Sequence, residues 1–217
     1  MNKLGLGIAA GLVLAACGDK AQEAGNAVSA LGQAANAATA MQNSQEEAEK
    51  FYQERREKGD TVAIAYSELQ KALPPSPNGY TPSGEPSGSS QSMGGFSMSQ
   101  AEQDYSGPAG AAEGNAPSIH ITIIDFGGTQ AGYGMLAAPM MMAFSQEDAH
   151  SRTRTITIDV PYTWGSEEYN KDSKTAKVTA VTRYRYVITV EARNQADDQS
   201  AMAKSLAEEI AKKFEGK

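Results

Sequence analysis

Hydrophobic and polar residues alternate along most of the C-terminal half of the chain, a pattern typical of strands that bury one face. The segments that carry this pattern predict a sheet of about six strands. They are residues 96–105, 118–126, 153–160, 162–169, 175–182 and 184–193. In the first of them, Phe96 and Met98 begin the inward face and one irregular step follows. In the last, the alternation places Arg183 and Arg185 on the face that points away from the core.

Apolar residues at three- and four-residue steps predict helices between and after these strands. The strongest pattern lies at the end of the chain, where Asp197 or Asp198 is expected to cap a helix. Its apolar stripe consists of Met202, Leu206, Ile210 and Phe214. A second helix is predicted at 130–144, with a kink at Pro139 because proline cannot donate a backbone hydrogen bond.

The N-terminal half is richer in small and charged residues, and it predicts a tether rather than a core. Residues 46–58 predict a charged helix whose only large apolar residues are Phe51 and Tyr52, so we expect this helix to be mostly solvated. A short helix is predicted at 66–73. Residues 74–95 are rich in Pro, Ser and Gly, and such a segment cannot bury enough apolar surface to fold by itself.

The N-terminus begins with a short positive region at Lys3, followed by an apolar stretch at 4–16 that is too short to span a bilayer. The stretch leads into a four-residue motif, Leu14, Ala15, Ala16 and Cys17. This motif resembles the lipobox of bacterial lipoproteins. The resemblance implies cleavage before Cys17, acylation of its thiol and attachment to the membrane through the acyl chains. Gly18 follows the cysteine, which resembles outer-membrane lipoproteins and implies a periplasm-facing location in the bacterial envelope.

Consecutive strands with helices between and after them favour an antiparallel sheet packed with helices, which is an α+β fold. The order of the elements resembles the PsbP-like fold, which is also seen in DcrB-like envelope domains. We divide the chain into four segments. They are a lipoprotein signal peptide at 1–16, an acylated cysteine with an Ala-rich and charged helical tether at 17–59, a short helix with a Pro/Gly/Ser-rich linker at 60–95, and an α+β globular domain at 96–217.

Charge and motif content exclude several functions. The chain has a formal net charge of −7, and an acidic protein repels the phosphates of nucleic acid. Its one cysteine, Cys17, excludes an internal disulfide. The sequence has no Gly-x-Ser-x-Gly, Walker or His-Glu-x-x-His motif, so we expect a protein that is not an enzyme and needs no cofactor. We expect His120 and His150 to be solvated or hydrogen-bonded rather than metal ligands.

Methionines crowd the segment of the predicted helix at 130–144. They are Met135, Met140, Met141 and Met142. Thioethers fill cores, form adaptable apolar surfaces for a ligand or partner, or bind soft metals such as Cu(I), and the sequence leaves these three interpretations open. Trp164, beside Gly165, is the aromatic residue best placed to stack on a ligand, with simple packing as the alternative.

Three functional hypotheses follow from these patterns. The leading one is a membrane-anchored, non-enzymatic binding or assembly module that acts on an envelope protein or ligand. The first alternative is a carrier or sensor of an apolar ligand or soft metal, which would use the methionine-rich segment. The second alternative is a structural oligomer that forms through the tether at 17–59.

Overall fold

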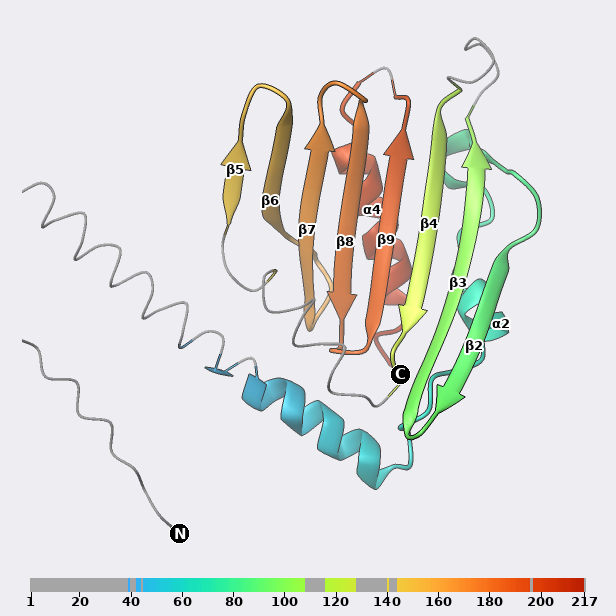
Figure 1. Cartoon of the computed structure of the whole chain (residues 1–217), viewed down its shortest axis with the longest axis vertical. Coiled ribbons are helices and arrows are strands. Elements are labelled where there is room, and N and C mark those ends of the chain that lie inside the picture. The colour runs from blue at the N-terminus through green and yellow to red at the C-terminus, as the bar shows by residue number, and fades with distance from the viewer. Residues whose placement is uncertain are drawn as a thin grey trace, which may run out of the picture. The chain divides into compact units, whose positions relative to one another are not determined.

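The computed structural model describes residues 39, 42–43, 45–107, 116–127, 140, 144–195 and 197–216. The chain divides into two compact units, Met1–Thr39 and Ala40–Lys217. The described fold is that of the second unit. Its centre is a sheet in which every pair of neighbouring strands is antiparallel (Figure 1).

The described residues form a sheet of nine strands in the order β1-β3-β4-β9-β8-β7-β6-β5, with β2 also paired to β3. The strands are β1 Thr81–Pro82, β2 Ser87–Met93, β3 Phe96–Ser106, β4 Ser118–Asp125, β5 Ser145–Glu147, β6 Ser151–Thr157, β7 Thr163–Asn170, β8 Thr175–Thr182 and β9 Tyr186–Arg193. Ile121 of β4 lies opposite Val190 of β9, which lies opposite Val178 of β8. The apolar residues that we predicted to face inward on neighbouring strands therefore lie opposite one another.

The sheet is larger than the predicted six strands, although the α+β class is confirmed. Two of the added strands, β1 and β2, lie within residues 60–95, which we expected to be a linker, and both pair with β3. The third is β5, a three-residue strand at the opposite edge. These short strands contain almost no apolar residues, so no alternation marks them in the sequence. Pairing with a neighbouring strand satisfies their backbone groups instead.

Two helices cover one face of the sheet. Helix α4 (Ser200–Lys212) packs against β8 and β9, and helix α2 (Tyr66–Gln70) packs against β2 and β3, both behind the sheet in Figure 1. The core lies between these helices and the sheet. Its largest fully buried apolar side chains are Tyr105, Tyr186, Phe214, Leu69, Ile119, Ile121, Ile123, Ile188, Ile210 and Val178. Most of the predicted stripe of the last helix is therefore buried, with Met202 packed at its margin.

The segment before β2 belongs to the core of the same unit. Leu69, Leu73 and Tyr80 are all buried. The hydroxyl of Tyr80 donates to Gln195 Oε1 at 2.7 Å, and a 3₁₀ turn over Pro77–Gly79 precedes this tyrosine. A segment without a core of its own thus becomes ordered by contributing a few side chains to the core of the sheet.

Strand β3 alternates regularly, without the irregular step that we predicted. Its inward residues include Ser97 and Ser99, whereas Phe96 is 38% exposed. The hydroxyl of Ser97 accepts the N–H of Ala63 at 2.9 Å, and the hydroxyl of Ser99 bonds to that of Ser90 at 2.8 Å. Serine is tolerated on the inward face because both hydroxyls have partners.

Arg185 is buried, which corrects our prediction that it points away from the core. Strand β9 begins at Tyr186, and the three residues before it form the turn from β8, with positive φ at Arg183 (53°) and Tyr184 (52°). The turn ends the two-residue alternation, so strand periodicity does not predict the direction of Arg185. Its Nε donates to Asp125 Oδ1 at 2.7 Å.

Asp125 is the centre of a hydrogen-bonded cluster that attaches residues 60–64 to the end of the sheet. Its carboxylate also accepts the N–H groups of Ile64 and Gly127, both at 2.8 Å. Gly127 has a φ of +59°, and a Cβ there would lie 2.8 Å from the backbone nitrogen of Ala63. Glycine is required at this position because the two segments approach so closely.

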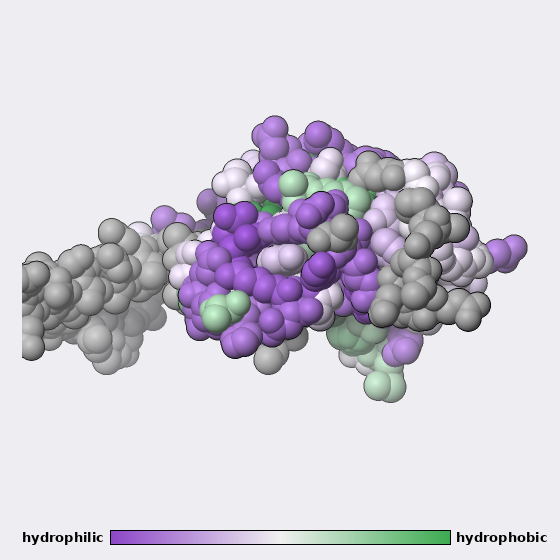
Figure 2. Space-filling model, turned by 90° about the horizontal axis from the view of Figure 1, so that it is seen from above, coloured by the Kyte–Doolittle hydropathy of each residue, from purple (hydrophilic) through white to green (hydrophobic). Residues whose placement is uncertain are grey.

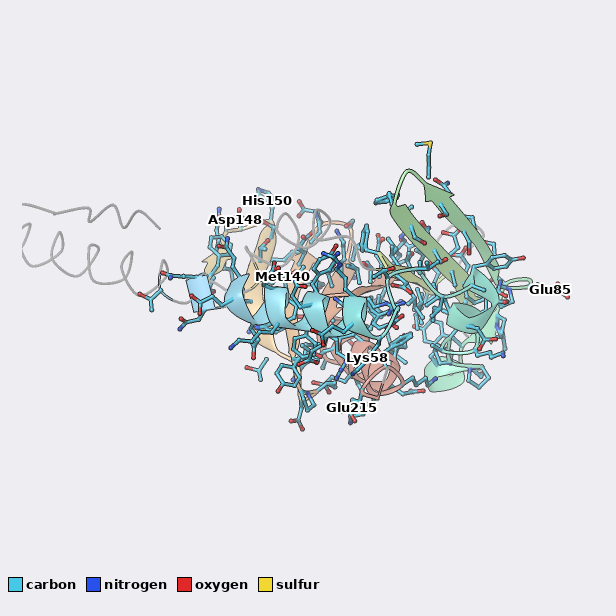
Figure 3. All side chains as sticks on the ribbon, turned by 90° about the horizontal axis from the view of Figure 1, so that it is seen from below. Lys58, Glu85, Met140, Asp148, His150 and Glu215 are labelled. Carbon is cyan, nitrogen blue, oxygen red and sulfur yellow. The ribbon has the colours of Figure 1, made fainter. Side chains whose placement is uncertain are left out.

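The helix at residues 45–57 packs against the rest of the second unit along one side. Seen from below, it crosses the lower end of the sheet (Figure 3). The ring of Phe51 lies 4.9 Å from that of Tyr162 and 5.6 Å from that of Tyr184, measured between centroids. Tyr184 donates its hydroxyl hydrogen to Glu47 Oε2 at 2.8 Å. Most residues of this helix are exposed, as we expected, but the contacts of Glu47 and Phe51 attach it to the rest of the folded unit.

Candidate functional site

A cavity of about 510 Å³ lies between β6, β7 and the first turns of α4. We call it the β6–α4 pocket. The charged and hydroxyl side chains that matter for its chemistry are Arg152, Arg154, Glu167, Asp198, Ser200 and Lys204. Seen from above, hydrophilic residues make up most of the described surface, with several smaller apolar patches among them (Figure 2).

Glu167 is a buried carboxylate that holds two arginines in place. It lies on the inward face of β7 and is 2% exposed. Its Oε1 accepts from Nε of Arg152 at 2.9 Å, and its Oε2 accepts from Nη2 of Arg154 at 3.0 Å. A buried carboxylate needs such partners to offset its desolvation. Because one negative charge lies between two positive ones, the group as a whole stays cationic.

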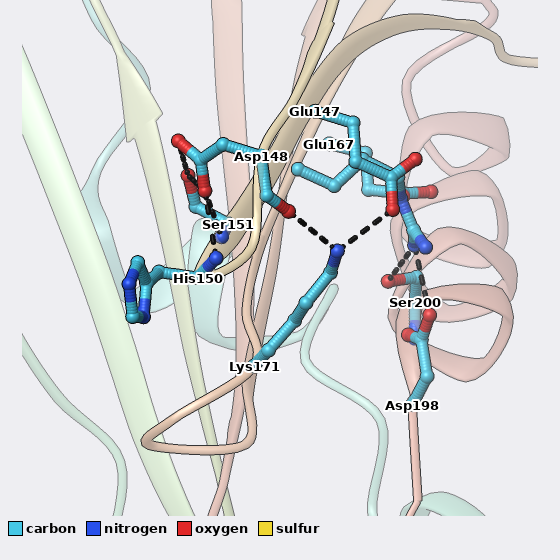
Figure 4. Close-up of polar contacts among 9 residues, drawn as sticks. Glu147, Asp148, His150, Ser151, Glu167, Lys171, Asp198 and Ser200 are labelled. Atoms are coloured by element: carbon cyan, nitrogen blue, oxygen red, sulfur yellow. Dashed lines mark hydrogen bonds and ion pairs between the residues drawn. The ribbon is translucent and has the colours of Figure 1, made fainter.

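Arg152 connects this buried carboxylate to the start of α4, and its partners Glu167, Asp198 and Ser200 are labelled in Figure 4. Its Nη2 donates to Asp198 Oδ2 at 2.8 Å and to the hydroxyl of Ser200 at 3.3 Å. The hydrogen bond to Asp198, followed by those to Glu167, raises the pKa of Arg152 despite its partial burial. Arg152 is thus held by three acceptors, Glu167, Asp198 and Ser200, and it orients the wall of the pocket.

Asp198 performs most of the capping role that we predicted for Asp197 or Asp198. The N-cap position itself is Gln199, but the Oδ1 of Asp198 accepts the N–H of Ser200 at 2.9 Å. Burial alone would raise the pKa of Asp198, but the hydrogen bonds from Ser200 and then from Arg152 outweigh it and hold that pKa below its ordinary value. Asp198 therefore stays ionised beside the positive end of the helix dipole.

Two cations in the pocket keep hydrogen-bond donors available. Arg154 has 46% of its side chain exposed, and among the described residues its only hydrogen-bond partner is Glu167. Its Nε and Nη1 groups therefore remain free to donate to a ligand. The Nζ of Lys204 lies 3.4 Å from Glu208 Oε1, and the lysine side chain is 39% exposed. The three cations and two carboxylates of the lining leave one net positive charge in a protein that is acidic overall.

The turn between β5 and β6, next to the pocket residues in Figure 4, is held by its own polar contacts. Lys171 Nζ donates to Glu147 Oε1 at 2.8 Å and to the carbonyl oxygen of Asp148 at 2.7 Å. Asp148 Oδ1 accepts the N–H groups of His150 and Ser151 at 2.8 and 2.7 Å, and these bonds lower the pKa of Asp148. The strand that carries Arg152 therefore begins from a well-defined turn.

A second polar group lies on the opposite face of the sheet and resembles a catalytic triad in its hydrogen bonding. His120 Nδ1 is 2.9 Å from Asp104 Oδ1, and its Nε2 is 3.0 Å from Thr122 Oγ1. Acyl transfer also needs N–H groups that are free to stabilise an oxyanion. Strand β4 pairs with β3 on one side and with β9 on the other, so the N–H groups around Thr122 are already used. We interpret the group as a hydrogen-bonded polar row on the sheet surface.

Of the residues that we predicted for a ligand surface, the structure describes Met140 and Trp164, and both lie beside Val181. Met140 is partly buried and packs against the cluster of Val181 and Val187, which matches the core-filling interpretation for this residue. Trp164 is half-buried, and its ring centroid lies 4.5 Å from that of Tyr184. Neither residue lines the β6–α4 pocket. The other predicted residues, Met135, Met141 and Met142 together with the lipobox of Leu14, Ala15, Ala16 and Cys17, lie outside the described residues.

The pocket residues were not predicted from the sequence, although a signal was present. Arg152 and Arg154 alternate along the strand with the same spacing as Ile156, whose side chain packs against the core, so all three lie on the inward face. Two arginines on an inward face require acidic partners there. Glu167 lies on the inward face of the next strand and is that partner, but the sequence does not show which strands are neighbours.

None of the helices in the described part of the chain is long and apolar enough to cross a membrane. Within the same residues, no group of three or more His, Cys, Asp or Glu side chains is arranged to hold a metal ion.

Comparisons with known proteins add little to this description. No protein-family model matches the chain, and no curated protein matches it. Among solved structures, the chain is similar to the extracellular domain of PknH from Mycobacterium tuberculosis, with 14% sequence identity and a TM-score of 0.43. The match covers 72% of this chain and 100% of that one. Similarity of this degree transfers neither a fold assignment nor a function.

Proposed function

We propose that this chain is a membrane-tethered, non-enzymatic binding module of the bacterial envelope, and that its β6–α4 pocket takes a small anion bearing a carboxylate or phosphate group. The observation that carries the proposal is the cationic pocket itself. Arg154, whose Nε and Nη1 have no partner among the described residues, and Lys204, which also pairs with Glu208, line a cavity of about 510 Å³, while Glu167 and Asp198 fix the surrounding groups. Charge-assisted hydrogen bonds of this kind are the strong ones in proteins.

The start of α4 supports an anion in the same place. The N-cap residue Gln199 makes no side-chain hydrogen bond, although Asp198 accepts the N–H of Ser200. Ser200 and Ala201, which begin α4, both line the pocket. The other N–H groups of the first turn carry partial positive charge, so an anion there would interact with them and with Arg154 and Lys204 together.

The tether in this proposal is the N-terminal segment, with acyl chains on Cys17 as the anchor. Its support is the lipobox pattern in the sequence. The mass of the intact protein extracted from its own membranes tests it, since acylation and cleavage before Cys17 change that mass in a defined way. An uncleaved, unacylated chain would contradict the anchor and leave the pocket unaffected.

Titration calorimetry on the full-length protein in detergent, at low ionic strength, tests the pocket. The probes are inorganic phosphate and succinate, which distinguish a phosphate from a carboxylate ligand. We expect one of them to bind with a stoichiometry of one. Since a hydrogen bond to a charged group contributes about 1.5–3 kcal/mol, the double variant R154Q/K204Q is expected to weaken binding by tenfold or more.

The matched control is K177Q/R193Q, which removes two cations from exposed pairs on the opposite face of the sheet. It changes the net charge by the same amount and is expected to bind the probe like the wild type. Absence of binding for both probes would refute the anion site. Equal weakening in both variants would show that only the overall charge matters.

A further inference from the structure

We propose that β2 is a dimerisation edge, at which two copies of this chain pair antiparallel through Ser87–Met93 and join their sheets. The inference does not depend on the β6–α4 pocket, which lies toward the other end of the sheet. All seven residues of β2 are exposed, and β3 is their only strand partner among the described residues. Within the part of the chain that the structure describes, the other long side of β2 is therefore open for pairing.

The hairpin geometry identifies which backbone groups are free. Gly94 and Gly95 form a two-residue turn with φ values of 58° and 84°, which is the type I′ geometry. In such a hairpin the flanking residues, Met93 and Phe96, exchange both hydrogen bonds, and the bonding alternates from there. The hydrogen bond from Ser83 N to the carbonyl oxygen of Asp104 agrees with this alternation. It shows that the even-numbered residues of β3 direct their backbone groups toward β1 and β2.

It follows that the odd-numbered residues of β2 bond to β3, and the even-numbered ones direct their N–H and C=O groups outward. These are Gly88, Ser90 and Ser92. When Ser90 lies opposite Ser90 of a second copy, Gly88 lies opposite Ser92 of that copy. Each facing pair can then exchange two backbone hydrogen bonds. The strand is therefore complementary to itself around a two-fold axis, the symmetry of most homodimers.

The side chains of β2 allow this pairing. The sequence SGSSQSM has no charged residue and no proline, the features with which natural sheets protect an exposed edge. The opposite edge shows such protection, because β5 has three residues and ends in Glu147. Met93 is 82% exposed and Phe96 is 38% exposed at the tip of the hairpin. In the dimer, Met93 would lie opposite Ser87 of the second copy and lose part of this exposure.

Charge variants at two exposed positions test the register directly. Ser89 faces Gln91 of the second copy, and facing side chains on one side of a sheet interact. S89K/Q91K brings like charges together at both facing pairs, whereas S89K/Q91E brings opposite charges together. Gly88 is left unchanged because a Cβ there would lie 2.6 Å from the carbonyl oxygen of Gln100.

The measurement is native mass spectrometry of the full-length protein, released from detergent at micromolar concentration, with a thermal melt of each variant as the folding control. We expect dimers for the wild type and for S89K/Q91E, and monomers for S89K/Q91K. A monomeric wild type would overturn the proposal. A dimer that survives in S89K/Q91K would also overturn it and would locate self-association elsewhere, such as in the tether. Phosphate and succinate titrations of the same variants report on the pocket separately.

Discussion

Arg185 and Asp125 form a buried, two-pronged ion pair at the end of the sheet. Nε of Arg185 lies 2.7 Å from Asp125 Oδ1, and Nη2 lies 3.0 Å from Oδ2. The side chains are 2% and 0% exposed. Burial alone would lower the pKa of Arg185, but the hydrogen bonds and charge of Asp125 outweigh it and raise that pKa. Arg185 Nη1 also bonds to Asp60 Oδ2 at 2.7 Å, so the pair attaches the segment that leads from the N-terminal helix.

Breaking this pair should be strongly destabilising. We expect R185M to lower the free energy of unfolding by about 3–5 kcal/mol, because it leaves a buried carboxylate without its counter-charge. D125N should have a similar effect. The double variant should cost less than the sum of the two by about 1–3 kcal/mol, since the second change no longer breaks the pair. Urea unfolding of the four proteins gives these values.

The control for that cycle is R193M, which removes an exposed ion pair with Glu191. Exposed pairs contribute about 0–1 kcal/mol, so little change is expected. Additive effects of R185M and D125N would mean that the two side chains do not interact as the geometry indicates.

Phe51 should determine whether the helix at 45–57 stays packed on the domain. Its ring contacts Tyr162 and Tyr184, and the guanidinium of Arg183 lies 5.2 Å from its centre. We expect F51A to accelerate trypsin cleavage within the helix while the melting temperature of the sheet stays the same. Local release of this kind exposes backbone without unfolding the core.

The matched control for F51A is Y52A, because Tyr52 interacts with Arg56 of its own helix, 5.9 Å away. Cleavage of Y52A should proceed at the wild-type rate. Equal protection of the helix in F51A and the wild type would show that Phe51 does not hold it.

Two buried tyrosines should respond differently to removal of the hydroxyl group. Tyr105 donates to the carbonyl oxygen of Pro74 at 2.6 Å, whereas the hydroxyl of Tyr186 has no hydrogen-bond partner among the described residues. We expect Y105F to destabilise the protein by about 0.5–1.5 kcal/mol and to leave the carbonyl of Pro74 unpaired. Y186F should be neutral or stabilising. Denaturant unfolding of the two variants, which delete the same atom, decides the point.

The same tyrosines predict a loss of stability at high pH. Burial, with a contribution from the charge of Glu209, raises the pKa of Tyr105 to about 12. Burial raises the pKa of Tyr186 to about 12 as well, although Arg185 opposes the shift. The ordinary value is about 10, so their contribution is fully present below pH 10 and is lost as the pH rises through 12. Absorbance at alkaline pH should show Tyr105 and Tyr186 ionising only as the protein unfolds, and Y105F and Y186F should each remove one such tyrosine.

The elements with their own periodicity were predictable from the sequence. The alternation of Ile119, Ile121 and Ile123 predicted β4, and the four-residue steps of the last helix predicted the buried stripe of α4. Each of these patterns results from the burial of one face of a single helix or strand. It can therefore be interpreted without knowing which element packs against that face. The fold class follows because such elements pack in few ways.

The pairing of polar groups between distant segments was decided only by the tertiary structure. Arg185 and Asp125 are 60 residues apart, and Arg152 and Asp198 are 46 apart. Strand β2 carries no apolar alternation, and it is a strand because β3 lies beside it. A buried charge, or a strand without apolar alternation, is stable only when a second segment pairs with it. The local sequence does not show which segment that is. The sequence by itself therefore determined the lipobox pattern, the α+β class and the main core rows. The pocket, the docked helix and the open edge arise from contacts that exist only in the folded chain.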